Sequence, residues 1–212
     1  MDETMTSSLR LFFVIVLALL AEGPTIKAQI SPAKRDIHWS EKSSSVSPDL
    51  KWRLEVSPQG EDGPAVVSIR RTTDETKHVL FRLQRDASVI WSPDSTSLMV
   101  EDRLFSDHYR LMLFHIPFQS QSEQKALSIN RSVKAAVKRS LNPGEQINYY
   151  LPEAIGWRDG HWLIAVGVTT VRGGSGPFTA HCLGFLVNDR GVITQSLSDS
   201  QLKDKFGATC QM

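Results

Sequence analysis

The chain has 212 residues, 41% of them hydrophobic, and its 24 lysines and arginines are nearly balanced by 23 aspartates and glutamates. A formal net charge of +1 gives no general attraction to nucleic acid or to anionic lipid, so neither is expected as a partner. The length is sufficient for one domain with a substantial hydrophobic core.

The first 28 residues are typical of a secretory signal peptide. A basic residue precedes the apolar run LFFVIVLALLA, and cleavage is expected after Ala28, with Gly23 and Ala21 as the alternatives. The run is shorter than the ~20 apolar residues that cross a bilayer, so no membrane anchor is expected after cleavage. We therefore expect an exported, soluble protein, periplasmic or secreted.

The rest of the chain has the pattern of a β protein. Residues 29–49 are polar and serine-rich, which predicts an extended or loosely held lead-in segment. From residue 50 apolar and charged residues alternate, as in LKWRLEV, the pattern of a half-buried strand. Further strands are predicted at 65–71, 78–83, 89–91, 98–101, 108–116, 162–171, 178–187 and 192–197. Short, closely spaced strands favour one all-β, mainly antiparallel domain over residues 50–212.

Residues 128–141 have the period of a helix instead. Apolar side chains recur every three or four residues from Ile129 to Leu141, Ser128 is expected to cap the start, and Asn142-Pro143-Gly144 ends the pattern. The opposite face is basic. We interpret it as a solvent-exposed face, with docking on an anionic surface as the alternative; its residues are Arg131, Lys134, Lys138 and Arg139. A second short helix is predicted at Asp199–Lys205.

The chain contains two cysteines, Cys182 and Cys210. In an oxidising compartment two cysteines most simply form a disulfide, which would hold the C-terminal tail on the strand that carries Cys182. A bridge that closes a loop of this length stabilises the fold by roughly 3.6 kcal/mol in the chain-entropy model. The alternative is a free reactive thiol and a second thiol in a frayed tail.

Two segments of the sequence are similar to each other. Each has a short strand ending in tryptophan, a tight turn with aspartate, and an apolar returning strand; they read VIWSPD with SLMV, and IGWRDG with WLIAV. The first, Trp91-Ser92-Pro93-Asp94-Ser95 with its returning strand, resembles the repeat of TolB-like and other WD40-like β-propellers. The resemblance covers 87–116 well and 154–188 loosely.

This resemblance implies four-stranded, blade-like units whose surfaces bind proteins or ligands, and it brings no catalytic residues. Blades of ~40–45 residues leave room for about three units, fewer than a closed ring needs. We therefore expect three blade-like sheet units, the third over 52–83 without the motif. A two-layer β-sandwich is the alternative.

Aromatic residues near turns are the candidate binding residues. Tyr149 and Tyr150 follow the end of the predicted helix, Trp157 closes a predicted strand, and Arg172 precedes the glycine-rich loop at 173–176. Aromatic side chains on loops commonly recognise sugars, peptides or proteins, and loops on a rigid scaffold often carry function. We expect these four residues to contribute to a recognition surface.

The leading hypothesis is an exported, non-enzymatic binding module whose partner is another envelope or secreted protein, or a small ligand. The histidines lack the spacing of a zinc site, and neither a metal nor a cofactor is expected. One alternative is a small envelope hydrolase that uses Asp107-His108, or Asp159 with His161. Another is a structural subunit that completes its sheet on a partner chain.

Overall fold

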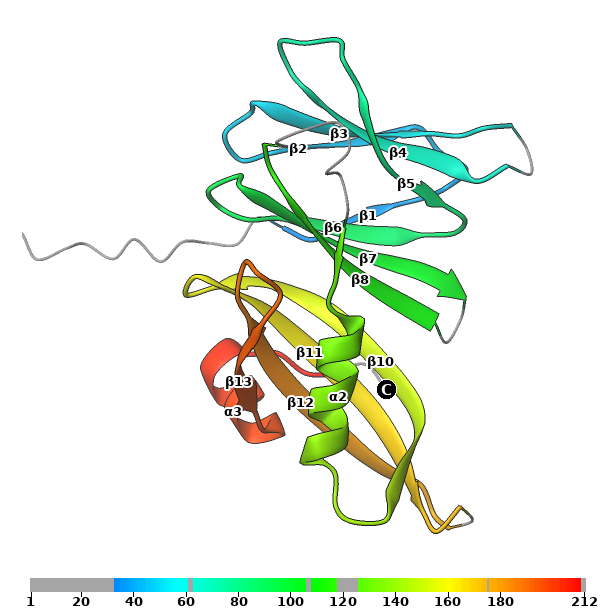
Figure 1. The fold of residues 1–212 in the computed structure, drawn as a ribbon, viewed down its shortest axis with the longest axis vertical. Helices are drawn as coiled ribbons and strands as arrows, with labels where there is room; N and C mark the ends of the chain where they lie inside the picture. Colours follow the sequence, from blue (N-terminus) through cyan, green and yellow to red (C-terminus); the bar gives the residue numbers. More distant parts are fainter. Residues whose placement is uncertain (1–32, 61–62, 106–107, 118–125, 175, 211–212) are drawn as a thin grey trace, which may run out of the picture.

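The computed structural model describes residues 33–60, 63–105, 108–117, 126–174 and 176–210, and within them the chain forms three antiparallel sheets and two short helices (Figure 1). The all-β prediction is therefore confirmed, and none of the three sheets closes into a barrel. Among these residues no helix has the length and apolar character needed to span a membrane.

The first and third sheets are built from consecutive strands, whereas the second sheet joins one early strand to four later ones. The first contains, in spatial order, β2 (Ser43–Val46), β3 (Trp52–Ser57), β4 (Ala65–Arg71) and β5 (His78–Leu83). The second contains β1 (Arg35–Ile37), β6 (Ala87–Trp91), β7 (Ser97–Phe105), β8 (His108–His115) and β9 (Leu127–Ser128). The third contains β10 (Glu145–Arg158), β11 (His161–Arg172), β12 (Thr179–Val187) and β13 (Ile193–Leu197). The helices are α2 (Asn130–Ser140) and α3 (Asp199–Phe206).

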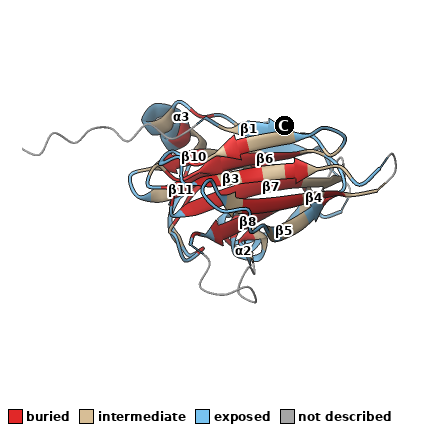
Figure 2. Cartoon of the chain, turned by 90° about the horizontal axis from the view of Figure 1, so that it is seen from above, coloured by how far each residue is buried: buried red, intermediate tan, exposed pale blue. Residues whose placement is uncertain are grey.

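The three sheets stack along the long axis of the molecule (Figure 1). The second sheet is apolar on both faces. Successive side chains of a strand point to opposite sides, and successive residues of its central strands are apolar. Val89 and Val100 belong to the core shared with the first sheet, whereas Ile90 and Met99 belong to the core shared with α2 and the third sheet. β6 is accordingly buried along its whole length, and β7 is buried from Ser97 to Asp102 (Figure 2).

A third, smaller core lies on the other face of the third sheet. There Leu202 of α3 packs against Leu163 and Leu197. The predicted disulfide is present, with Cys182 of β12 bonded to Cys210 and the Cα atoms 5.6 Å apart. It holds the chain that follows α3 against this face.

Two turns have the same hydrogen bonds 45 residues apart. Ser92 Oγ donates to Asp94 Oδ1 at 2.6 Å and accepts the Ser97 N–H at 2.9 Å. Ser47 Oγ donates to Asp49 Oδ1 at 2.6 Å and accepts the Trp52 N–H at 3.0 Å. The first sheet therefore carries the Ser-Pro-Asp turn as well, contrary to the expectation that its unit lacks the motif.

The described part of the lead-in segment contains extended strands, as one of its two predicted conformations has it, and these strands are held in place by pairing. Within its described part, residues 33–49, β1 pairs with β6 and β2 pairs with β3, so this stretch is integrated into two sheets rather than loosely held. Ser45 of β2, 5% exposed, accepts a hydrogen bond at 3.0 Å from the indole of Trp91 in the second sheet. The apolar pattern there is too short to reveal strands whose partners lie elsewhere in the sequence.

Candidate functional site: a basic groove between α2 and β10

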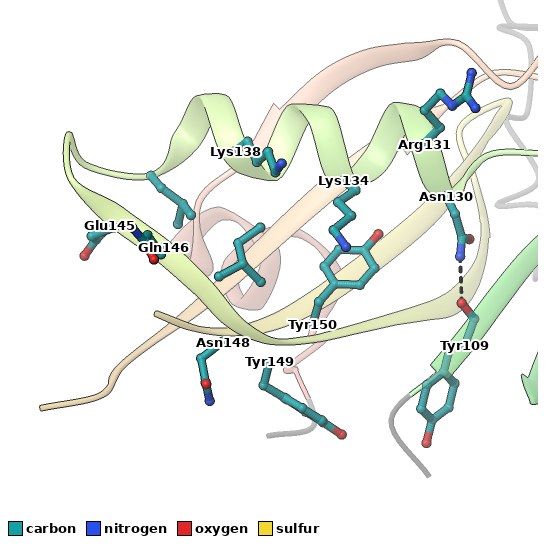
Figure 3. Close-up of a pocket in the computed structure, with 12 residues that line it drawn as sticks. Tyr109, Asn130, Arg131, Lys134, Lys138, Glu145, Gln146, Asn148, Tyr149 and Tyr150 are labelled. Atoms are coloured by element: carbon teal, nitrogen blue, oxygen red, sulfur yellow. Dashed lines mark hydrogen bonds between the residues drawn. The ribbon is translucent and has the colours of Figure 1, made fainter. Parts of the chain in front are cut away.

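A groove of about 950 Å³ separates α2 from the first half of β10 (Figure 3). The helix contributes Asn130, Arg131, Lys134 and Lys138, and the strand contributes six consecutive residues, 145–150. Leu141 lies at one end, where the helix turns into the strand, and Tyr109 of β8 lies at the other. One wall is therefore helical and basic, and the other is the border of a sheet.

The basic wall follows from the helical repeat. Arg131, Lys134 and Lys138 are spaced by three and four residues, which places them along one side of a helix. All three are exposed, and within the described part of the chain none forms an ion pair with a carboxylate. The Lys134 ammonium lies over the ring of Tyr150, 5.7 Å from its centroid. The groove thus carries positive charge that the described residues leave uncompensated.

The side chain of Asn130 fixes the start of α2 by making two hydrogen bonds to the backbone of β8. Asn130 donates from its amide nitrogen to the Tyr109 carbonyl at 2.6 Å and accepts the Leu111 N–H at 2.7 Å. It thereby extends the pairing of β8 by one step beyond β9. The expectation that Ser128 caps the helix is wrong, because Ser128 belongs to β9 and pairs with Met112; the residue at the cap position is Ile129, whose side chain makes no capping hydrogen bond.

The other wall is the open edge of the third sheet. Among the described residues β10 pairs with β11 alone, and β7 and β8 of the second sheet approach it without forming a strand ladder. A strand that presents a face to a cavity contributes alternate residues, whereas six consecutive lining residues indicate that the groove runs along the strand edge. The register shifts between Ile147 and Tyr149, so Asn148 is the extra residue of a bulge.

Tyr149 and Tyr150 lie on opposite sides of β10. Tyr150 points toward α2, whereas Tyr149 and Asn148 point away from it (Figure 3). The Tyr150 hydroxyl is buried and has no hydrogen-bond partner among the described residues, and this burial raises the pKa of the phenol well above its usual value. The floor of the groove therefore has an aromatic surface and one unsatisfied polar atom.

The carboxylate of Glu145, which lines the groove, interacts with Asn142 and His181. Its Oε2 accepts the backbone N–H of Asn142 at 2.9 Å, and its Oε1 lies 3.4 Å from His181 Nε2. These contacts, with the Asn142 hydrogen bond the strongest, lower the pKa of Glu145. The carboxylate thus holds the connection between α2 and β10 and does not neutralise the lysines.

The four residues expected to bind a partner are only partly brought together. Tyr149 and Tyr150 line the groove. Arg172 is exposed and pairs across the ladder with Glu145, but it does not line the groove. Trp157 is only 8% exposed and packs edge-to-face on Trp162, with ring centroids 4.9 Å apart. A residue so buried contributes to the core.

The sequence predicts the basic wall and favours a solvent-exposed face, with docking on an anionic surface as the alternative. The exposure is as expected. The signal that distinguishes the groove side is the spacing 131, 134, 138, which separates these residues from Arg139 on the same helix. What the sequence did not indicate is which element lies opposite, because most of β10 was not predicted as a strand.

The residues suggested for a hydrolase are not gathered in the groove. His161 Nδ1 lies 2.9 Å from the backbone carbonyl of Asp159 in the turn between β10 and β11. Neither residue lines the groove or the smaller pocket of about 170 Å³ beside Trp52. Asp107 and the side chain of His108 lie outside the described residues, and among those described no three His, Cys, Asp or Glu side chains cluster as a metal site.

Comparison with protein-family models, with curated proteins and with solved structures found no match for this chain.

Proposed function

We propose that this chain is an exported, non-enzymatic binding module that holds its partner in the groove between α2 and β10. The observation that carries the proposal is the combination of three basic side chains without carboxylate partners in the described residues, an aromatic floor and an open strand edge around one groove. A surface of this kind attracts an anionic partner and offers it both charge and hydrogen-bonding groups.

Export is supported by the apolar run at 11–21 and by the disulfide, a bond that persists in oxidising compartments. The repeated Ser-Pro-Asp turn and the three consecutive antiparallel sheets support a relation to blade-like repeats, whose surfaces commonly bind proteins or ligands. The partner is another envelope or secreted protein, or a small ligand.

The test is affinity capture from native extract, with the eluate read by native mass spectrometry. The double variant Lys134→Gln/Lys138→Gln removes two charges from the groove. We expect it to lower the amount of partner retained about tenfold. The matched control Arg139→Gln/Lys205→Gln removes two exposed charges that do not line the groove, and it should retain the partner as the wild type does. A partner retained equally by all three proteins, or none retained by any, would contradict the proposal.

A further inference from the structure

We propose that the groove takes an acidic polypeptide segment in extended conformation, which pairs with the open edge of β10 and directs its carboxylates toward Arg131, Lys134 and Lys138. This inference rests on the proposed binding function and adds the chemical class and the conformation of the partner. Such strand addition derives affinity from the backbone and specificity from alternate side chains.

One part of the β10 edge is covered by a side chain of the second sheet, and another part borders the groove. Near the second sheet the edge is covered, because the Ala154 N–H donates to Glu101 Oε2 at 3.1 Å instead of to a strand. Over residues 146–150, β11 is the one pairing partner of β10 in the described part of the chain, and there the groove borders β10. Unpaired backbone groups at a sheet edge are a template for a further strand. The free part of the edge and the basic helix wall thus face the same space.

The spacing of the cations fits an extended chain. Arg131 and Lys138 are seven residues apart, which is about 10 Å along a helix. Three alternate residues of a strand span about 13 Å. Flexible lysine and arginine side chains can accommodate this difference. Carboxylates at every second position of the segment can therefore each meet one of the three cations.

The side chains on the two faces of β10 predict which residue types fit at each position of the bound segment. An added strand directs alternate side chains to the two faces of the sheet. On the face toward α2 they meet the cations and the ring of Tyr150, and on the other face they meet Tyr149 (Figure 3). The pattern that fits is acidic residues alternating with apolar ones. A free phosphate or a sulfated glycan would use the cations alone and leave the strand edge unpaired.

The probe is an acetylated and amidated heptapeptide in which four glutamates alternate with three valines. Its dissociation constant is measured by calorimetry and its location by backbone amide chemical shifts of the intact protein. Replacing glutamates with glutamines should weaken binding about tenfold, and so should Lys134→Gln/Lys138→Gln. The control Arg139→Gln/Lys205→Gln should bind within about twofold of the wild type, because its charges lie outside the groove.

Two N-methylated forms of the peptide test the strand pairing directly. Amides of successive residues point to opposite edges of a strand, so those of every second residue lie on one edge. Methylation of the glutamate amides or of the valine amides therefore removes donors from one edge only. We expect one form to lose binding and the other to bind as the parent does.

Equal binding of both methylated forms would overturn strand addition, as would shifts that map away from residues 145–150. Failure of the peptide to bind, while inorganic phosphate or a sulfated polysaccharide shifts the groove amides, would overturn the inference and leave the binding module intact. If the capture experiment gives no partner that depends on the groove, the proposed function itself is wrong.

Discussion

At the scale of single residues, Tyr150 offers the clearest test of the groove. Its hydroxyl is buried without a partner among the described residues, and burial raises the pKa of the phenol. In the unfolded chain a tyrosine ionises near pH 10, so above this pH the folded state retains a proton that the unfolded state has lost. Stability therefore falls as pH rises, by up to about 1.4 kcal/mol per pH unit for this group.

Tyr150→Phe removes this contribution. We expect the variant to lose less stability than the wild type between pH 10 and 11 in urea unfolding, and to be as stable as the wild type or more so at pH 7, because an unpaired buried hydroxyl is removed. Burial also raises the pKa of Tyr109, which is present in both proteins, so its effect cancels in the comparison. Parallel pH dependence of the two proteins would contradict the buried environment of Tyr150.

At the scale of elements, α3 shows that residues at and beside the ends of a helix can suffice to predict it from the sequence. The sequence predicts a helix over Asp199–Lys205, and the structure has one over Asp199–Phe206. Ser198 Oγ accepts the Gln201 N–H at 3.3 Å, and Gln201 Oε1 accepts the Ser198 N–H at 3.0 Å. Gly207, with φ at 61°, ends the helix in the left-handed region that glycine tolerates. Start and stop signals both lie within a few residues of the helix.

Ser198→Ala removes this cap. We expect a loss of about 1 kcal/mol in the free energy of unfolding, measured by urea titration, because the Gln201 N–H loses its acceptor, Ser198 Oγ. Ser196→Ala, an exposed change on β13, is the control and should stay close to the wild type. Equal effects of the two changes would show that the cap makes no specific contribution.

The strand β10 illustrates the opposite case. Only its last residues, around Trp157, were expected to form a strand. Asn148 forms a bulge that breaks the period of two, and Pro152 argues against a central strand. In the structure the proline is acceptable because β10 is an edge strand. Whether a strand lies at an edge depends on its neighbours in space, which the local pattern does not contain.

At the scale of the whole molecule, Lys34 connects the second and third sheets. Its ammonium lies 3.0 Å from Glu101 Oε2 in β7 and 2.9 Å from Glu153 Oε1 in β10. Burial opposes its charge, but the carboxylates of Glu101 and Glu153 outweigh burial and raise the pKa of Lys34. Glu101 is only 2% exposed, so its charge depends on the cations beside it.

Lys34→Met is expected to lower the free energy of unfolding by roughly 2 kcal/mol, less than for a fully buried pair because Arg103 remains 3.6 Å from Glu101. Lys51→Met is the matched control. Lys51 lies 3.6 Å from Asp49 in an exposed pair, and its loss should cost at most about 1 kcal/mol. Urea unfolding at pH 7 gives both values, and similar values for the two variants would contradict a connecting role for Lys34.

The sequence by itself determined what depends on short-range pattern and composition: an all-β antiparallel chain, the boundaries of β4 and β5, two helices, and a disulfide between its two cysteines. Period, turn residues and capping residues act over a few positions, so a single sequence contains them. The tertiary structure decided the rest. It placed Trp157 in the core, integrated β1 and β2 into separate sheets, and set Lys134 opposite the free edge of β10. These relations join residues far apart in the chain, and only packing brings them together.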